Sequence, residues 1–251
     1  MRPKHDDEAT HPDTPTSLAI ERREGVTPPN CTQFPVVIPP GFAPTFSDCD
    51  GPPKNAQGKQ CAGYVAPYSV AWGGGFWAAR NHGGTPSFHR ARDIGCAEGA
   101  EFRSPTSGQV PRRYSGVGGG PGAGCSPEKS GNYVVIVGDD GWIWYGAHLR
   151  DLPLVQPGDH VQAGQLLGYV GRTGNARRKT GNGWYGCPHL HLSLTSPARL
   201  RNWIARGAKP FDHGRTYSAT LLGPEGLRVA FRNEKVDPTP FLAALPGAPK
   251  R

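Results

Sequence analysis

Three histidine-containing stretches hold side chains that could bind a metal ion and move protons. His89 and Asp93 lie four residues apart, His148 ends a short apolar run, and His189 and His191 form an H-x-H pair. On a strand, both imidazoles of such a pair leave the same face, about 6–7 Å apart. The pair could therefore share one metal ion, or one histidine could bind the ion while the other acts beside it.

Two histidines and an aspartate suit a tetrahedral zinc ion whose fourth position stays open to water. The chain has no H-E-x-x-H motif, so the helix-borne glutamate base of many zinc proteases is absent. If a water held by zinc attacks a carbonyl here, a histidine must handle the protons. A Cys187 thiolate would instead close the fourth position and make the zinc structural, whereas a disulfide at Cys187 would leave it open.

The elements that would position these residues are short apolar runs bounded by glycine and turn residues, which predict strands. The predicted strands cover residues 133–137, 142–145, 166–170 and 189–194. Asp140-Gly141 is a hairpin signal between the first two strands, and residues 197–206 are predicted as a helix. Trp142 and Trp144 share one face of their strand, and the pattern leaves open whether they pack in the core or line a groove.

Glycine and proline supply 36 and 27 of the 251 residues, and hydrophobic residues only 36%. This composition argues against a helical bundle. The six tryptophans, nine phenylalanines and eight tyrosines argue equally against disorder throughout the chain. Short strands joined by glycine and proline turns satisfy both observations. The predicted fold is all-β: an antiparallel sheet, open or sandwich-like, with long loops and a groove that holds zinc.

Four stretches of the chain, taken in order, carry a family resemblance. They read FHRARDIGCAEGAEFRSPTSGQV, GNYVVIVGDDGWIWYGAHL, VQPGDHVQAGQLLGYVGRTGN and CPHLHLSL. Together they resemble the lysostaphin-type zinc metalloendopeptidases, which include the beta-lytic enzymes that cut peptidoglycan cross-links. The resemblance covers about residues 68–194. The sequence departs from the family at Ala91, where a glycine is usual, and at Gly186-Cys187, where Thr-Gly is usual.

The resemblance implies a zinc-dependent endopeptidase that hydrolyses stem or cross-bridge peptides of bacterial peptidoglycan. It implies that His89, Asp93 and His191 bind one zinc ion per chain. His148 and His189 would then be the catalytic pair, facing the attacking water and the oxyanion. The alternative is a non-catalytic cell-wall-binding or signalling module on the same fold. Relatives of that kind normally lose a ligand or a catalytic histidine, and this chain keeps all five residues.

The sequence predicts a division of the chain into three parts. Residues 1–30 are predicted to be disordered, a linker or a pro-region, and residues 31–62 an irregular, cysteine- and proline-rich arm. Residues 63–251 would form the zinc endopeptidase domain, with an insertion at about 195–236.

The six cysteines are even in number and form no C-x-x-C pair, a pattern typical of disulfides in an exported protein. Full pairing would need at least one bridge between the first three cysteines and the last three. We therefore expect a secreted or periplasmic protein, although no signal peptide is visible. The sequence has no run apolar enough to span a membrane, and we expect a monomer.

The formal net charge of +8 indicates either a solvated basic surface or attraction to anionic cell-wall polymers. Nucleic-acid binding would rest on charge alone, and we do not expect it. Four basic residues near the H-x-H pair are predicted to lie on a solvated loop, with contact to an anionic substrate as the alternative. These residues are Arg172, Arg177, Arg178 and Lys179.

Overall fold

The computed structural model describes residues 28–43, 70–82, 85–114, 130–176, 178–180, 183–197 and 235–250. Within these ranges the protein is almost entirely β, and its neighbouring strands pair antiparallel. The predicted all-β, antiparallel fold is therefore confirmed. None of the helices in these ranges has the length and apolar character needed to cross a membrane.

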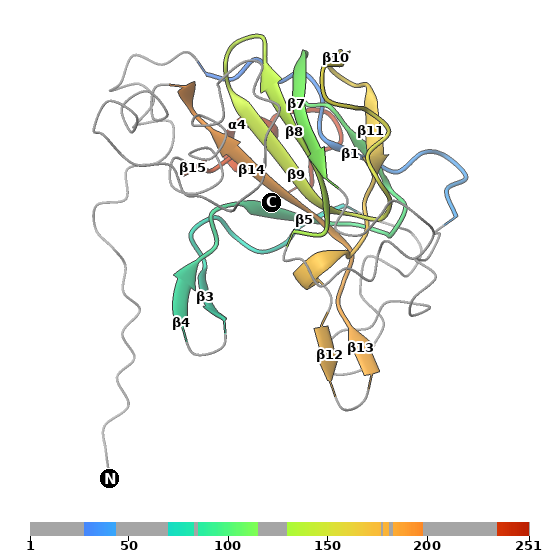
Figure 1. Cartoon of the computed structure of the whole chain (residues 1–251), viewed down its shortest axis with the longest axis vertical. Coiled ribbons are helices and arrows are strands. Elements are labelled where there is room, and N and C mark those ends of the chain that lie inside the picture. The colour runs from blue at the N-terminus through green and yellow to red at the C-terminus, as the bar shows by residue number, and fades with distance from the viewer. Residues whose placement is uncertain are drawn as a thin grey trace.

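The main sheet has eight strands in the order β10-β7-β8-β9-β14-β5-β2, with β15 pairing to β14 (Figure 1). Their bounds are β2 (Ala71–Trp72), β5 (Arg92–Gly95), β7 (Gly108–Tyr114), β8 (Asn132–Gly138), β9 (Ile143–Leu149), β10 (His160–Val161), β14 (His189–Thr195) and β15 (Lys235–Val236). Strand β14 lies between β9 and β5, so the three histidine-containing stretches meet at the centre of this sheet.

The remaining elements are smaller. A second sheet has the order β1 (Val36–Val37), β6 (Glu101–Arg103) and β11 (Leu166–Tyr169). Two hairpins, β3 (Ala79–His82) with β4 (Thr85–Phe88) and β12 (Arg178–Thr180) with β13 (Gly183–Tyr185), extend downward from the main sheet in Figure 1. The described helices are one 3-10 turn, η3 (Gly174–Ala176), and one α-helical turn, α4 (Thr239–Leu242).

The core is a single cluster to which both sheets contribute side chains. Phe102 of β6 and Leu190 of β14 meet at Gly146 of β9, where a Cβ atom would collide with the Phe102 ring. Gly146 thus allows close packing at this point. Trp142 and Trp144 are each only 1% exposed, so both pack in the core rather than lining a groove.

The predicted strands are found with small shifts. Residues 133–137 and 189–194 fall within β8 and β14, and residues 166–170 correspond to β11. Gly141 has a φ of +84° in the predicted hairpin turn, and the Gly138 N–H donates to the carbonyl of Trp142. Trp142 therefore belongs to the turn, and β9 begins one residue later than predicted. The predicted helix lies outside the described residues except for Pro197.

The cysteines and the arm differ from expectation. Cys31 and Cys96 are free thiols, so the even number of cysteines does not mean that all six are paired. Cys96 is buried in the core and Cys31 packs against it, where both act as small apolar side chains. Phe34 and Val36 are also buried core residues, so this part of the predicted arm belongs to the β-structure. Cys187 is disulfide-bonded, which excludes a thiolate ligand there.

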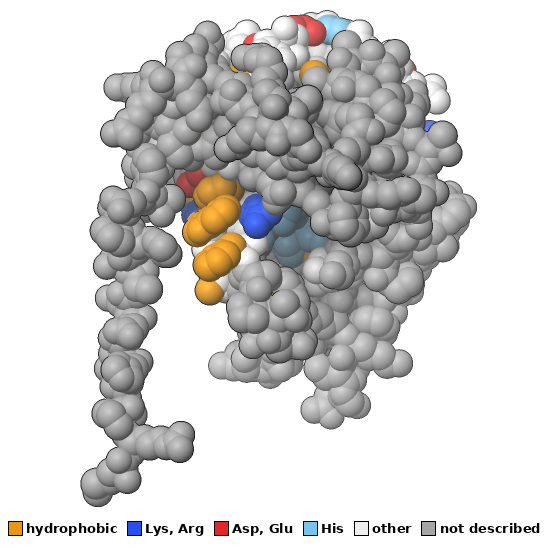
Figure 2. Space-filling model, turned by 60° about the vertical axis from the view of Figure 1, so that its left-hand side comes forward, with side chains coloured by type: hydrophobic (Ala, Val, Ile, Leu, Met, Phe, Trp, Pro, Cys, Tyr) orange, Lys and Arg blue, Asp and Glu red, His pale blue; other side chains and the backbone are white. Residues whose placement is uncertain are grey.

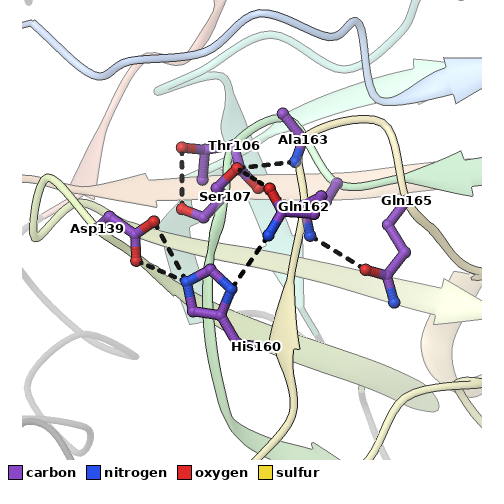
Figure 3. Close-up of polar contacts among 8 residues, drawn as sticks. Thr106, Ser107, Asp139, His160, Gln162, Ala163 and Gln165 are labelled. Carbon is purple, nitrogen blue, oxygen red and sulfur yellow. Dashed lines mark hydrogen bonds and ion pairs between the residues drawn. The ribbon is translucent and has the colours of Figure 1, made fainter.

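A polar network lies at the end of the sheet where β8 turns into β9 (Figure 3). His148 lies near the other end of β9. The His160 ring contacts the Asp139 carboxylate at 3.0 Å, and the Ser107 hydroxyl donates to the Gln162 side chain and accepts from the Ala163 N–H. These contacts join the β8–β9 turn to β10, and the β6–β7 connection to the β10–β11 connection.

Candidate metal centre

Strand register explains how residues distant in sequence come together. In β14, His191 stands opposite Asp93 of β5 on one side and Ala147 of β9 on the other. Leu190 and Leu192 alternate with the two histidines and are fully buried in the core. His189 and His191 therefore share the other face, as the H-x-H spacing predicts.

The proposed ligand residues form a compact triangle. His89 Nε2 lies 3.1 Å from His191 Nδ1, and Asp93 Oδ1 lies 3.1 Å from each of these nitrogens. A tetrahedral zinc ion with bonds of about 2.0–2.1 Å separates its ligand atoms by about 3.3–3.4 Å. Two imidazole nitrogens and one carboxylate oxygen at these separations fit such an ion, and one tetrahedral position remains for water or substrate.

Backbone contacts fix the His89 ring. Its Nδ1–H donates to the carbonyl of Gly75 at 2.9 Å, because a carbonyl oxygen can only accept. Nε2 is therefore the ring nitrogen that faces the other two ligand atoms. The His89 backbone is held on both sides as well: its N–H donates to the Ala78 carbonyl, and its carbonyl accepts from Trp77.

A β-bulge brings His148 to the same face. The β8–β9 register shifts between Asn132 and Tyr133, which leaves His148 as the extra residue of β9. His148 has a φ of +66°, in the left-handed region that few non-glycine residues occupy. Because one residue is inserted, Leu149 returns to the core while the His148 ring lies 5.0 Å from the His189 ring and 5.5 Å from the His191 ring.

The His148 ring has a defined orientation. Its Nδ1–H donates to the Thr173 carbonyl at 2.8 Å, so Nε2 is the nitrogen that can accept a proton. The residue is only 5% exposed. Burial, together with the charges of His189 and His191, holds the pKa of His148 well below its usual value. His148 is therefore a neutral proton acceptor near pH 7.

His189 faces His148 from the neighbouring strand. Its Nδ1–H donates to the Cys187 carbonyl at 2.9 Å, and its Nε2 lies 3.8 Å from Asp93 Oδ1. The side chain is 21% exposed, so the site is open to solvent on this side. The structure thus brings all five predicted residues into one cluster, with the ligand triangle beside the two remaining histidines.

Asp93 is the anionic centre of this cluster. Burial raises its pKa, but the close contacts with His191 and His89 and the nearby His189 outweigh burial and hold the pKa well below its usual range. Burial lowers the pKa of His191. An ionised carboxylate is the state that a divalent metal ion requires of an aspartate ligand.

An exposed aromatic surface flanks the ligands. The rings of Trp77 and Phe88 stack at 5.4 Å with an interplanar angle of 8°, and they are 41% and 52% exposed. The Arg90 guanidinium lies 5.7 Å from the Trp77 ring centroid. Figure 2 shows hydrophobic, basic and histidine side chains next to one another on this face of the molecule. We call Trp77, Phe88 and Arg90 the aromatic platform.

The sequence does not reveal the groups that orient the histidines. Gly75, Cys187 and Thr173 act through backbone carbonyls, which any residue type could supply. The prediction that Arg172 lies on a solvated loop is wrong, because the residue is 2% exposed and ion-paired with Glu98. Arg177 and the side chains of Arg178 and Lys179 fall outside the described part of the structure, as does most of the segment at 195–236.

Comparison with known proteins gives a family match for part of the chain. Residues 87–202 match the model of peptidase family M23. Among solved structures, the chain is similar to a zinc-containing peptidase from Vibrio cholerae, with 28% identity over 54% of this chain and 36% of that one and a TM-score of 0.39. This chain therefore spans about a third of the Vibrio cholerae protein.

Two further structures are similar over longer parts of the chain. The catalytic domain of the antimicrobial peptidase lysostaphin from Staphylococcus simulans is 21% identical over 70% of this chain and 93% of that one, with a TM-score of 0.42. A putative M23 peptidase from Pseudomonas aeruginosa is 16% identical over 83% of this chain and 54% of that one, with a TM-score of 0.38. The five clustered residues all lie within residues 87–202, the segment that matches the model of peptidase family M23.

Proposed function

We propose that this protein is a zinc-dependent endopeptidase that hydrolyses peptide bonds in the stem or cross-bridge peptides of bacterial peptidoglycan. The observation that carries the proposal is the triangle of His89, Asp93 and His191 ligand atoms, 3.1 Å apart on each side, with two further histidines beside it. A purely structural metal site would have four protein ligands and no need of these additional imidazoles.

The mechanism follows from the donor set and the two orienting hydrogen bonds. His89, Asp93 and His191 would hold the ion, which supplies Lewis acidity toward the scissile carbonyl and lowers the pKa of a bound water. His148, neutral and with its Nε2 available, accepts the proton of the attacking water. Because the Nδ1–H of His189 is bonded to the Cys187 carbonyl, His189 would donate to the developing oxyanion from Nε2 in its doubly protonated form, a contribution of about 2.7–4 kcal/mol in other hydrolases.

Two other features support a polymeric substrate outside the cytoplasm. The aromatic platform lies one residue from the ligand His89 and offers an exposed surface on which a chain that reaches the metal can rest. The disulfide at Cys187 suits a secreted or periplasmic protein. The net charge of +8 suits a wall rich in anionic groups.

Mass analysis of peptidoglycan fragments tests the proposal. Purified peptidoglycan is digested with the full chain, with and without a zinc chelator, and the soluble products are sequenced by tandem mass spectrometry. We expect new amino and carboxyl ends within the peptides, intact glycan linkages, and no products with chelator. Cleavage between sugars would contradict the proposal, and undigested peptidoglycan would favour the non-catalytic module.

A further inference from the structure

A short backbone segment contacts both of the histidines that the proposed function makes catalytic. We call Gly171–Thr173 the strap. The Gly171 N–H donates to the His148 carbonyl at 3.0 Å, and the Gly171 carbonyl accepts from the His189 N–H at 3.2 Å. The Thr173 carbonyl accepts from the His148 ring at 2.8 Å. Displacement of the strap would therefore disturb both histidines at once.

The strap has little room on either side. A Cβ on Gly171 would collide with the backbone of Arg150, and a Cβ on Gly131 would collide with Thr173. The Thr173 hydroxyl accepts from the Asn132 N–H at 2.9 Å and donates to the Leu149 carbonyl at 2.8 Å. These contacts tie the strap to the ends of β8 and β9, next to the bulge.

The middle residue of the strap is fixed from another direction. Arg172 Nε donates to the Glu98 carboxylate at 3.0 Å, and the side chains of the two residues are 2% and 0% exposed. Glu98 lies on the loop from β5 to β6. This loop pairs with the residue before the strap, because the Gly99 N–H donates to the Val170 carbonyl and the Val170 N–H to the Ala100 carbonyl.

A buried ion pair is seldom the cheapest way to stabilise a core, because both charges lose their hydration. Packed apolar side chains of similar volume would serve stability at least as well. A directional, charge-assisted hydrogen bond does fix the position of the atoms that it joins. Arg172 lies between Gly171, whose backbone bonds His148 and His189, and Thr173, whose carbonyl bonds the His148 ring. This location suits that role.

We propose that the Glu98–Arg172 pair is a positioning device: it holds the strap where its backbone orients His148 and His189 for catalysis. The side chains of Arg172 and Glu98 are 2% and 0% exposed, so neither is open to a substrate. The inference rests on the proposed function. It adds two residues, Glu98 and Arg172, whose charges would govern turnover through the strap without taking part in zinc binding.

The test compares Glu98→Gln with the matched control Glu101→Gln, which removes a carboxylate from the Glu101–Arg103 pair on β6. Zinc content, kcat and KM are measured for each full-length variant. We expect Glu98→Gln to lower kcat about 10- to 100-fold with KM and zinc content unchanged, because small misplacement of catalytic groups is that costly. Glu101→Gln should match the wild type.

A proton NMR spectrum gives a readout that does not depend on activity. The His148 Nδ1–H, held by the Thr173 carbonyl, should give a resolved downfield signal in the wild type and in Glu101→Gln. In Glu98→Gln this signal should broaden or shift. An unchanged signal together with kcat within twofold of the wild type would overturn the proposal.

A second variant covers the case in which Glu98→Gln does not fold. The double variant Glu98→Leu with Arg172→Met replaces the pair by apolar side chains. We expect it to fold with reduced kcat, and full kcat would overturn the proposal. If neither variant folds, the pair is a requirement of the fold and the proposal fails. If the wild-type protein shows no zinc-dependent hydrolysis, the proposed function is refuted instead. The NMR comparison would still test whether the Glu98–Arg172 pair holds the His148 ring in position.

Discussion

His148 combines a strained backbone with a defined ring orientation. Its left-handed φ of +66° costs conformational energy that a residue accepts only where the surrounding structure imposes it. Strand alternation alone would send this ring into the core. The imposed conformation turns the ring toward His189 instead. The residue types and the H-x-H spacing predict all five members of the cluster. They do not predict the bulge, because no residue type marks it.

The burial of His148 gives a prediction for stability without metal. Its pKa in the folded protein lies well below the usual 6.5, so below about pH 6.5 the unfolded chain binds more protons than the folded one. The free energy of unfolding of the chelator-treated protein should therefore fall as the pH drops from about 7 to about 5.

Urea unfolding at both pH values measures this fall. In His148→Gln the fall should be smaller, because one of the groups that cause it is gone. Asp93 contributes only at lower pH, since its pKa is held below the usual 3.8. An unchanged difference between the two pH values in His148→Gln would show that His148 is already charged in the folded protein.

At the scale of the elements, the order β9-β14-β5 brings the site residues together. Sequence predicts the strands of the β8–β9 hairpin and β14, because alternation and the Asp140-Gly141 turn are local signals. It does not predict that β5 pairs with β14, a contact between residues about a hundred positions apart. Nor does it predict the burial of Arg172, since a run of basic residues resembles a solvated loop.

Gly146 tests the packing of Phe102 against β9. Gly146→Ala places a methyl group against the Phe102 ring and should lower the free energy of unfolding by about 1–3 kcal/mol. The control is Gly95→Ala, whose methyl group would have ordinary contact with the Ala71 carbonyl at 3.7 Å. Chemical denaturation measures both variants. Equal stability of the two would mean that the core around Phe102 adapts freely.

The aromatic platform gives a prediction for substrate binding. Trp77→Ala removes an exposed ring beside the site and should raise KM for peptidoglycan several-fold, with zinc content and kcat little changed. Leu154→Ala is the control, because Leu154 is 58% exposed on the connection between β9 and β10. A steady-state KM of Trp77→Ala equal to that of the control would remove the platform from the substrate path.

The whole molecule combines a basic chain with an open site. A net charge of +8 attracts anionic polymer over distances set by the ionic strength. Composition thus predicts the fold class, and turn chemistry explains much of the high glycine and proline content. Composition does not predict which cysteines pair. The even number of cysteines suggests disulfides, whereas Cys96 is a free thiol buried in the core.

Charge attraction makes binding to the cell wall dependent on salt. Raising sodium chloride from about 0.05 M to about 0.5 M shortens the screening length from about 14 Å to about 4 Å. The fraction of protein that sediments with purified cell walls should fall accordingly. Cleavage of a short neutral peptide should change much less, since its binding involves few charges. Salt-independent sedimentation would show that the basic surface does not contribute to wall binding.

In the proposed mechanism, three residues hold the metal ion while two neighbouring histidines perform the chemistry. Zinc content and dye release from labelled peptidoglycan, measured together on His148→Ala and His89→Ala, test it most directly. The mechanism predicts that His148→Ala keeps its zinc but loses at least about 100-fold in hydrolysis, and that His89→Ala loses both. Hydrolysis at the wild-type rate by His148→Ala would contradict it.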